Sequence, residues 1–341
     1  MSINDLFTDA ARQLLGDQCT PAVVRAIEQG GSTSSLWAQL EQAGFPDALV
    51  TEADGGSGLG LDAIFGVFEL CGEFSVPVPL AETMLIRGLL SHAGLDRPSG
   101  TTVFARGELL QNGTLQAGLV RMGRVADHVL VNLDGQWLLL PCASAQRTDS
   151  AFCLDASLVW MADAVAAAPR FNLDLPADAS LRVLQACVVS ALTSGALQAV
   201  FRRTLQYANE RTQFGRPIGK FQAIQHQLAV MSEHVFAARM AAQVACSTAG
   251  VVPNALRVAV AKARTSEAAL AVAELSHSIH GAIGFTAEYD LQLLTRRLHG
   301  WRQTAGSETY WHDQLGQVLV SQRSGLALDL IRETTDPLQE V

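Results

Sequence analysis

The stretch that decides the fold is residues 207–226, which read YANERTQFGRPIGKFQAIQH. It joins two long segments of helical apolar periodicity through a short polar turn. Two glycines and a proline in the turn interrupt the helical pattern, and Phe221 begins the next helix. The turn also carries Arg211 and, three positions later, Phe214. The pattern therefore predicts a tight corner between two helices that displays a guanidinium beside an aromatic ring.

Such a corner suits a ligand with a diphosphate and a flat base. The guanidinium of Arg211 pairs bidentately with phosphate, and the ring of Phe214 stacks on the base. A structural alternative also fits these two residues: Arg211 caps the last carbonyls of the preceding helix, and Phe214 fills the core. The residue types alone leave both interpretations open.

The whole twenty-residue run is more specific than this pair. It closely resembles the signature R-x-Q-F-G-x-P-I-G-x-F-Q-x-I-Q-H of the acyl-CoA dehydrogenase flavoprotein family. In that family the run links two helices of a C-terminal bundle, and its Arg and Phe meet the pyrophosphate and adenine end of an FAD held largely by the neighbouring subunit. The resemblance implies that Arg211, Gln213 and Phe214 bind FAD.

Composition indicates an ordered globular protein. The chain has 341 residues, of which 49% are hydrophobic and 17% charged, enough for a large buried core and for apolar faces that favour oligomers. The net charge of -9 disfavours nucleic acid or an anionic membrane as the main partner. A site for an anionic acyl-CoA is therefore expected to be a local basic pocket.

The cysteines and the N-terminus point to a cytoplasmic protein. The cysteines show neither C-x-x-C nor zinc spacing, so we expect buried free thiols in a reducing compartment. The first residues, MSINDLFTDAARQLL, predict an amphipathic helix rather than a signal or transit peptide. No apolar run has the length and flanks of a membrane span. The six cysteines are Cys19, Cys71, Cys142, Cys153, Cys187 and Cys246.

Three domains are predicted from the changes in residue pattern along the chain. Residues 1–98 form an N-terminal helical domain, in which a glycine-rich loop precedes an amphipathic helix from Leu61 to Glu73. Residues 99–176 contain short Val- and Leu-rich runs separated by turns such as Asn112-Gly113 and Asp134-Gly135, which predict a small β-barrel or sandwich. Residues 177–341 are helical.

The C-terminal segment predicts a four-helix bundle. Helices are expected over 179–209, 221–249 and 253–280, and a last helix is expected from near Gly306. The first of these would be ~45 Å long at 1.5 Å per residue. The predicted fold class is thus mainly α with a small β domain.

Both remaining domains resemble the same family. Residues 36–83 resemble its N-terminal helical domain, through L-W-x-x-L, G-G-x-G-L-G and a final V-P-x-P-L-A-E-T. The family's middle domain covers the flavin ring and carries a T-E-P-x-x-G-S/D loop. That loop is absent here, and the domain is shortened.

A second cofactor segment is indicated at residues 279–302. It resembles the family's G-G-x-G-Y/F-T-x-E-Y loop, whose backbone approaches the adenosine diphosphate part of FAD. The resemblance implies FAD contacts at His280, Gly281, Ala282, Gly284 and, further on, Ser307. Two positions depart from the family, since Ala282 replaces a common Gly and Ser278 a common Gln.

These segments also have structural interpretations. The spacing His277-x-x-His280 places two imidazoles on one helical face, but without a third ligand it favours packing over a metal site. Ser307 is also a candidate N-cap for the following helix, with Glu308 in its first turn.

The family's chemistry is α,β-dehydrogenation of an acyl-CoA thioester, which requires a desolvated carboxylate as base. The resemblance places that base at one of two positions, which hold Ala305 and Gln185, or a near neighbour of Gln185, in a stretch with no Asp or Glu between Asp178 and Glu210. Glu308 lies three residues beyond the first position, and a first-turn glutamate that stabilises its own helix is the simpler interpretation of it.

The pattern resembles the small subunits of the heterotetrameric (α2β2) acyl-CoA dehydrogenases of bacterial steroid side-chain catabolism. It implies a subunit that lacks the catalytic Glu and completes the FAD site of a related partner. Acyl-CoA is then the substrate, and an electron-transfer flavoprotein is the acceptor. Two alternatives remain: a self-sufficient homomeric enzyme with Glu308 as base, and a non-catalytic CoA-binding or scaffold protein.

Overall fold

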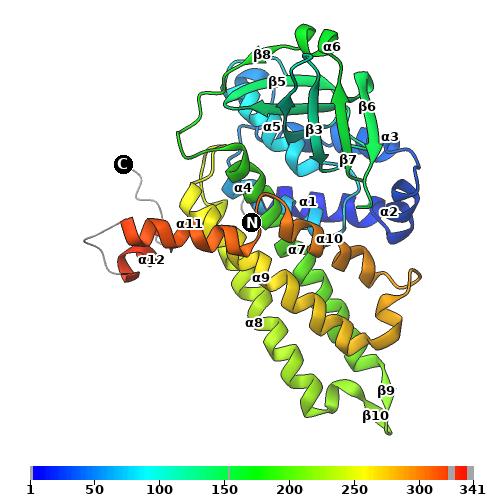
Figure 1. The fold of residues 1–341 in the computed structure, drawn as a ribbon. Coiled ribbons are helices and arrows are strands. Elements are labelled where there is room, and N and C mark those ends of the chain that lie inside the picture. The colour runs from blue at the N-terminus through cyan, green and yellow to red at the C-terminus, as the bar shows by residue number, and fades with distance from the viewer. Residues whose placement is uncertain (1–2, 153, 322–326, 336–341) are drawn as a thin grey trace. The chain divides into compact units, whose positions relative to one another are not determined.

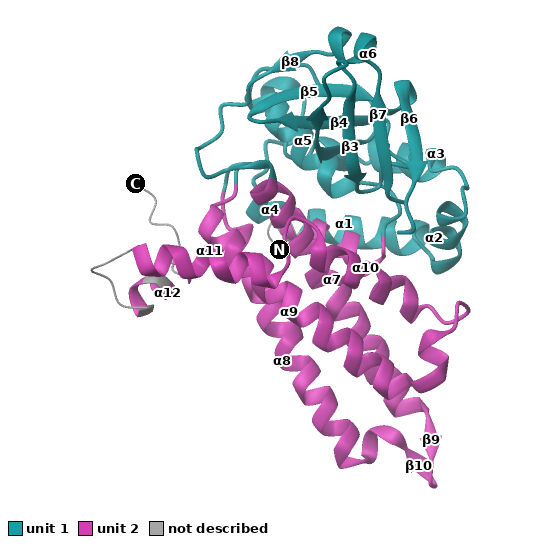
Figure 2. Ribbon diagram, viewed as in Figure 1, with its two compact units in different colours: residues 1–64, 76–181, 249–252 teal, residues 65–75, 182–248, 253–341 magenta. Residues whose placement is uncertain are grey.

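The computed structural model describes residues 3–152, 154–321 and 327–335. It divides into two compact units, which Figure 2 distinguishes by colour. Unit 1 comprises residues 1–64, 76–181 and 249–252, and unit 2 comprises residues 65–75, 182–248 and 253–341. The predicted fold class is confirmed, because helices flank a small β region in the middle of the chain and a helical bundle ends it (Figure 1).

The helices of unit 1 follow the apolar periodicity of the sequence. Thr20 caps one of them, because its hydroxyl accepts a hydrogen bond from Val23 N at 3.4 Å. The predicted amphipathic helix begins and ends where the sequence places it, and its residues from Phe65 onward belong to unit 2. The helices are α1 (Ile3–Gln18), α2 (Pro21–Glu28), α3 (Ser34–Gln42), α4 (Leu61–Glu73), α5 (Leu80–His92) and α6 (Ala162–Ala167).

The β region of unit 1 consists of two four-stranded sheets. One has the order β1-β4-β5-β8, in which β1 and β4 are parallel and the other pairs antiparallel. The other has the order β2-β3-β7-β6 and is antiparallel. The strands are β1 (Thr102–Arg106), β2 (Glu108–Leu109), β3 (Leu115–Val120), β4 (His128–Leu133), β5 (Gln136–Pro141), β6 (Ala145–Asp149), β7 (Ala156–Trp160) and β8 (Arg170–Phe171).

Apolar residues from both sheets form the core of this sandwich, among them Val129, Leu138, Leu158 and Trp160. The predicted turn Asp134-Gly135 joins β4 to β5, and both residues have positive φ, as a type I′ turn requires. The other predicted turn is longer than two residues. Leu110 N donates to Thr114 O across a three-residue loop that contains Asn112 and Gly113.

Unit 2 is a helical bundle. Its core consists of apolar residues such as Leu197 of α7, Met231 of α8, Val272 of α9 and Leu298 of α10. The elements are α7 (Leu181–Glu210), β9 (Thr212–Gln213), β10 (Arg216–Pro217), α8 (Gln222–Ala245), α9 (Ala255–His280), the 3-10 turn Gly281–Phe285, α10 (Leu291–Gln303), α11 (Glu308–Ser321) and α12 (Ala327–Thr335). The sequence did not predict α10, because the resemblance to a cofactor loop extends through it.

Two glycines let α4 and α7 approach closely within unit 2. A Cβ on Gly195 would lie 1.8 Å from Glu69 O, and a Cβ on Gly72 would lie 1.8 Å from Leu192 O. Since no side chain fits at either position, the two helices are in backbone contact. Helix α7 is long and apolar enough to span a membrane, but 78% of its apolar window is buried, as in a core helix.

Thiols and surface side chains complete the fold. The five described cysteines are free thiols, and all but the half-buried Cys142 are buried, which confirms that part of the prediction; Cys153 lies outside the described residues.

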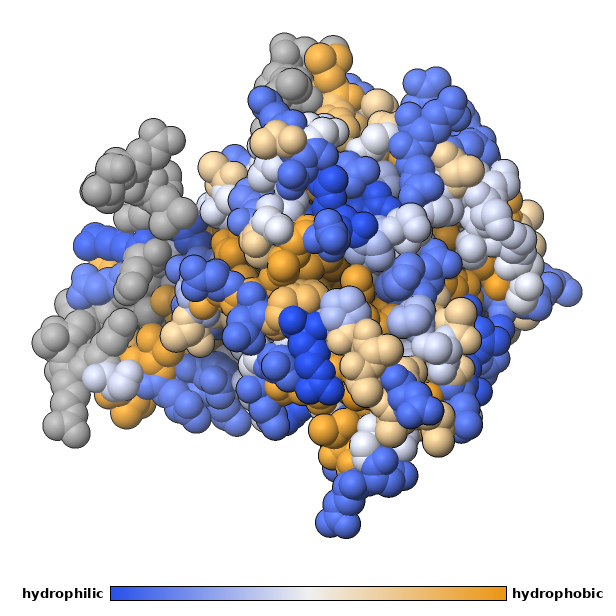
Figure 3. Space-filling model, turned by 90° about the horizontal axis from the view of Figure 1, so that it is seen from above, coloured by the Kyte–Doolittle hydropathy of each residue, from blue (hydrophilic) through white to orange (hydrophobic). Residues whose placement is uncertain are grey.

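Hydrophobic side chains also reach the surface in patches between hydrophilic ones (Figure 3). Among the described residues the most exposed large one is Phe214, with 92% of its surface accessible.

Candidate functional site

The corner after α7 is a short hairpin. Arg211 N still donates to Tyr207 O at 2.8 Å, and Arg211 O accepts from Ile218 N at 2.8 Å, so the chain leaves the helix and returns within seven residues. Strands β9 and β10 pair antiparallel, and the tip holds Phe214 at φ 51 and Gly215 at φ 81. Both central residues therefore adopt the left-handed conformation of a type I′ turn.

Phe214 is an exposed ring in a strained backbone conformation. A non-glycine residue at positive φ is uncommon and costs about 1–2 kcal/mol. Its ring contacts the edge of Phe221, with centroids 6.2 Å apart, and the guanidinium of Arg216 lies 4.2 Å from the Phe221 centroid. The structural alternative that Phe214 fills the core is wrong, because the ring lies almost wholly in solvent.

Arg211 and Gln213 are exposed on the same hairpin. Among the described residues no carboxylate pairs with Arg211, whereas Arg203, about two helical turns earlier, pairs with Asp290 at 3.2 Å. The corner thus presents a guanidinium, an amide and an aromatic ring outward, as a ligand with a diphosphate and a base requires.

The second predicted segment begins where α9 ends. His280 is buried, and its Nδ1 donates to Ser276 O at 2.7 Å, since a carbonyl can only accept. The other ring nitrogen, Nε2, is buried and has no hydrogen-bond partner among the described residues. Burial lowers the pKa of His280, so the imidazole is neutral at neutral pH. Because Nδ1 carries the proton, Nε2 is an acceptor without a donor.

The turn after His280 depends on a glycine. Gly281 has φ 63 and ψ -144, a region that only glycine adopts without strain, although a Cβ there would meet no atom within 4 Å. The requirement is therefore one of backbone conformation and not of space. Gly281 and Ala282 are exposed, Gly284 is buried, and Phe285 is exposed while stacking on His277 at 4.3 Å.

The hairpin and this turn lie at the same end of the bundle (Figure 1). Tyr207, one turn before the end of α7, stacks on His280 with ring centroids 4.4 Å apart, and its hydroxyl donates to His280 O at 3.3 Å. The structure thus brings the predicted positions Arg211, Gln213 and Phe214 to the same region as His280–Gly284.

His277 and His280 each have one ring nitrogen engaged within the chain. Nε2 of His277 contacts Thr295 Oγ1 at 3.1 Å, and Nδ1 of His280 donates to Ser276 O. Within the described ranges no group of three or more His, Cys, Asp and Glu side chains is placed to hold a metal ion.

Ser307 lies far from that end of the bundle. It follows Gly306, whose carbonyl accepts a hydrogen bond from Lys262 Nζ at 2.9 Å. Lys262 and His280 are 18 residues apart in α9, which is ~27 Å along a helix. The structure therefore separates Ser307 from the other predicted cofactor positions.

Lys262 fixes the segment around Ala305. This lysine is buried, and its ammonium also donates to Arg302 O at 2.9 Å and to Ser266 Oγ at 2.7 Å. Ala305 and Gly306 have φ 58 and 103, so the chain turns sharply between α10 and α11. An alanine at positive φ is strained, and the buried ammonium holds this conformation by binding the carbonyls on both sides of it.

Glu308 is the carboxylate nearest in sequence to Ala305. Arg302 Nε donates to its Oε2 at 2.9 Å, and a second, shorter contact joins Arg302 Nη2 to Oε1. The bond from Arg302 lowers the pKa of Glu308. The carboxylate is thus held as a bidentate ion pair. Gln185, at the other position expected for a base, is half-buried in α7.

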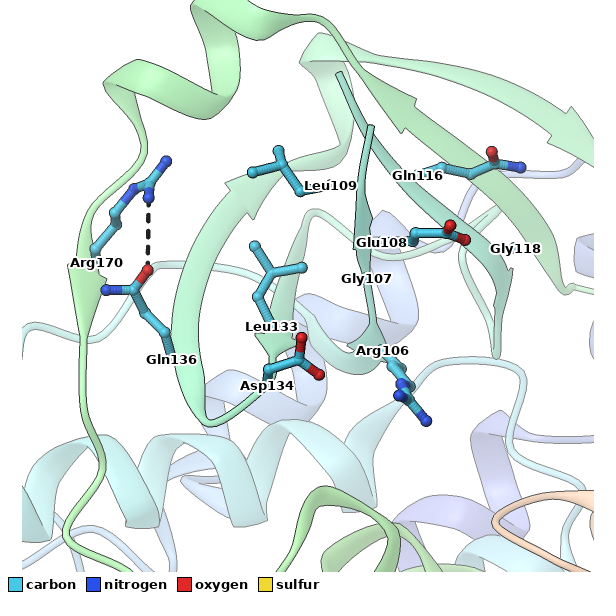
Figure 4. Close-up of a pocket in the computed structure, with 10 residues that line it drawn as sticks. All are labelled: Arg106, Gly107, Glu108, Leu109, Gln116, Gly118, Leu133, Asp134, Gln136 and Arg170. Atoms are coloured by element: carbon cyan, nitrogen blue, oxygen red, sulfur yellow. Dashed lines mark hydrogen bonds between the residues drawn. The ribbon is translucent and has the colours of Figure 1, made fainter. Parts of the chain in front are cut away.

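Unit 1 contains a hollow of about 730 Å³ beside the β sandwich (Figure 4). Arg170 and Gln136 face one another across one side of it, with Nη1 and Oε1 3.5 Å apart. Its charged side chains are two arginines and two carboxylates, so the hollow carries no net charge. It is lined by Arg106, Gly107, Glu108, Leu109, Gln116, Gly118, Leu133, Asp134, Gln136 and Arg170.

Sequence reasoning missed several buried charged residues, among them Glu69, Glu82 and Lys262. Glu69 accepts hydrogen bonds from Ser194 Oγ at 2.7 Å and Gln198 Nε2 at 2.8 Å inside unit 2, Glu82 is buried in unit 1, and Lys262 is described above. The available signal was a charged residue within an apolar helical stripe, which indicates a specific polar partner.

Comparison with known proteins identifies the family. The family described as "Acyl-CoA dehydrogenase, C-terminal domain" matches residues 184–319. Acyl-CoA dehydrogenase IpdE2 of Mycolicibacterium smegmatis is 30% identical over 309 residues, covering 89% of this chain and 94% of the relative.

Solved structures share the fold over nearly the whole chain. The Tcur3481-Tcur3483 steroid ACAD aligns with TM-score 0.80 at 25% identity, covering 94% of this chain and 99% of that one. The ChsE4-ChsE5 complex from Mycobacterium tuberculosis aligns with TM-score 0.83 at 22% identity, covering 95% and 99%. An FAD complex of PigA aligns with TM-score 0.76 at 17% identity, covering 94% and 98%. Because the match to IpdE2 spans most of both chains at 30% identity, the protein belongs to the acyl-CoA dehydrogenase family.

Proposed function

We propose that this chain is one subunit of an FAD-dependent acyl-CoA dehydrogenase that introduces an α,β double bond into an acyl-CoA thioester. The observation that carries the proposal is the outward corner of Arg211 and Phe214 beside the turn at His280. A steroid-derived acyl group is the proposed substrate class, which the similarity to a steroid ACAD supports. A cytoplasmic location belongs to the same proposal.

The residues at this end of the bundle fit the adenosine diphosphate part of FAD. Arg211 offers paired N–H donors for a diphosphate, and Phe214 offers a free aromatic face for a base. Gly281 lets the backbone approach phosphate without a side chain. The buried Nε2 of His280 is an acceptor that a ligand donor or a water would satisfy.

The chemistry that FAD supplies when bound is acceptance of the β-hydrogen as hydride. The protein must then position the thioester and hold a base for the α-proton. An electron-transfer flavoprotein is the proposed acceptor of the electrons.

We further propose that a related partner chain supplies the base, in an α2β2 assembly. The two positions that the family reserves for it hold Ala305 and Gln185, neither of which accepts a proton at neutral pH. The exposed hairpin supports a partner in another way. Phe214 is 92% exposed on its own chain, so a nucleotide carried by a neighbouring subunit would bury it.

The two alternatives have weaker support. Glu308 as the base of a self-sufficient enzyme is opposed by its bidentate pairing with Arg302, because a low pKa makes a weak proton acceptor. A non-catalytic CoA-binding or scaffold protein would not explain an outward guanidinium and aromatic ring on a strained hairpin.

Expression of the chain alone and together with a related neighbouring gene tests the proposal. We expect bound flavin and acyl-CoA dehydrogenation from the co-purified assembly only. If the chain alone is flavin-loaded and turns over acyl-CoA, the partner proposal fails. If no assembly contains flavin, the scaffold alternative holds.

The corner itself is tested by Arg211→Ala in the assembly. We expect a lower FAD content, because the diphosphate loses a bidentate donor. Arg332→Ala is the matched control, since Arg332 is an exposed arginine of α12 in the same unit and lies outside both predicted cofactor segments. Full flavin occupancy in Arg211→Ala would contradict the assignment of the corner.

A further inference from the structure

Within the part of the chain that the structure describes, strand β1 has no strand on its outer side. It is the first strand of the order β1-β4-β5-β8, and its inner side pairs in parallel with β4. In a parallel strand the N–H and C=O of one residue point to the same side, and the side alternates from residue to residue. The N–H and C=O groups of Thr102 and Phe104 point outward, away from β4. An unpaired edge of this kind needs other partners for its N–H and C=O groups.

The first turn of α5 provides these partners. Thr83 Oγ1 accepts from Thr102 N at 2.9 Å and donates to Thr102 O at 3.0 Å. One position earlier, Glu82 Oε2 accepts from Phe104 N at 2.9 Å. Two adjacent side chains thus replace the hydrogen bonds that a neighbouring strand would make, and they join α5 to β1 within unit 1.

The glutamate of this pair is an unusual choice. Only 8% of Glu82 is accessible to solvent, and the hydrogen bond from Phe104 N is its one bond among the described residues. An ionised carboxylate normally needs several donors when buried. Burial raises the pKa of Glu82 to about 7. The carboxyl group therefore holds its proton below neutral pH, although glutamate in water loses it near 4.3.

Two charged groups act on Glu82 across the sandwich. Asp155, before β7, raises its pKa, and Arg121, after β3, lowers it. These two residues are themselves an ion pair, and Asp155 Oδ1 also accepts from Met122 N at 2.9 Å. Because the pair is internally neutralised, Arg121 is not a full counter-charge for an ionised Glu82.

The held strand leads directly to the hollow. Arg106 is the last residue of β1, and Gly107 and Glu108 follow it along the wall of the hollow. Gly107 N donates to Asn132 O at 3.0 Å, so the wall continues the backbone of β1 with no flexible linker between them. Displacement of the β1 edge would therefore move Arg106 and the wall.

We propose that Glu82 and Thr83 act as a clamp on the free edge of β1, and that loss of the Glu82 proton loosens this clamp and the wall of the hollow. Glu82 is thus a proton-sensitive positioning residue of unit 1. The inference does not depend on FAD or a partner subunit, so it stands or falls separately from the proposed function.

Hydrogen exchange of the full chain tests the clamp. We expect the segment containing residues 102–104 to be protected at pH 5.5 and to exchange faster at pH 8.5 after correction for intrinsic rates. Ionisation of a buried carboxylate with one donor favours an open state in which the carboxylate is hydrated, and Phe104 N exchanges from that state. For a folded pKa of about 7, the opening equilibrium changes on the order of 10- to 100-fold across this range.

Three variants separate the clamp from general instability. Glu82→Gln keeps the acceptor without a titrating group, so protection should no longer depend on pH. Thr83→Val should raise exchange at Thr102 equally at both pH values. Glu52→Gln, at an exposed glutamate of the same unit, should behave as the wild type.

Two results would overturn the proposal. One is protection of residues 102–104 in the wild-type protein that stays constant from pH 5.5 to 8.5. This measurement does not require any variant to fold. The other is a Glu82→Gln protein with the same pH dependence as the wild type, which would assign the effect to another group.

Discussion

Tyr207 stacks on His280 with ring centroids 4.4 Å apart and an interplanar angle of 26°. The contact joins the last turn of α7, which leads into the hairpin, to the end of α9, which leads into the Gly281 turn. Two segments more than seventy residues apart are thereby held at one end of the bundle. The proposed nucleotide site depends on this contact, because the hairpin offers the guanidinium of Arg211 and the other segment offers the glycine turn that lets the backbone approach phosphate.

Phe214→Gly should stabilise the protein while weakening the proposed site. Phe214 adopts φ 51 and buries almost none of its surface, so glycine relieves strain of about 1 kcal/mol and loses little packing. Urea unfolding should show the gain, and flavin content of the assembly should show the loss. Phe236→Ala, at another exposed phenylalanine of the same unit, should leave flavin content unchanged. Destabilisation by Phe214→Gly would argue against strain at the tip.

Gly195→Ala should destabilise unit 2 strongly. The new methyl would lie 1.8 Å from Glu69 O, so α4 and α7 must separate, which we expect to cost about 3 kcal/mol or more. Gly316→Ala in α11 is the control, since a Cβ there meets no atom within 4 Å and should add about 0.5–1 kcal/mol of stability. Equal effects of the two substitutions on the urea midpoint would contradict the close approach of the helices.

Lys262→Met should loosen the segment between α10 and α11. The variant removes the ammonium that donates hydrogen bonds to Arg302 O and Gly306 O. We expect the free energy of unfolding to fall by about 2 kcal/mol. Urea unfolding measures this loss, and hydrogen exchange should rise at residues 303–307 first. Lys220→Met, at an exposed lysine, should have neither effect. Unchanged exchange in Lys262→Met would mean that the strained turn at Ala305 is held by other contacts.

Glu308→Gln distinguishes an ion pair from a catalytic base. As a partner of Arg302, Glu308 should contribute at most about 1 kcal/mol to stability, and the assembly should keep its activity. Because the pKa of Glu308 is lowered on folding, its contribution is present above the unfolded carboxyl pKa and disappears as the pH falls through the folded pKa. The stability difference between variant and wild type should therefore shrink in acid. Abolished turnover with retained flavin would instead make Glu308 the base.

Local sequence patterns predicted much of the fold. The approximate bounds predicted for the helix Leu61–Glu73 and for the end of α9 at His280 agree with the structure, and Asp134-Gly135 forms the predicted two-residue turn. These features depend on apolar spacing and on residues with fixed backbone preferences, which act within a few positions. The domain boundaries at residues 98 and 176 stay predictions, because the structure groups the N-terminal helices and the sandwich in one unit.

The sequence by itself determined the family, the succession of a helical, a β and a second helical segment, and the residue types of the corner, because each is encoded in neighbouring positions. Only the tertiary structure decided that Phe214 is exposed, that Ser307 lies away from His280, and that Glu308 is paired with Arg302. It alone revealed Glu82 on the edge of β1 and Lys262 under the Ala305 turn. The physical reason is that exposure, pairing and the protonation of a buried group depend on partners distant in sequence, which no local pattern specifies.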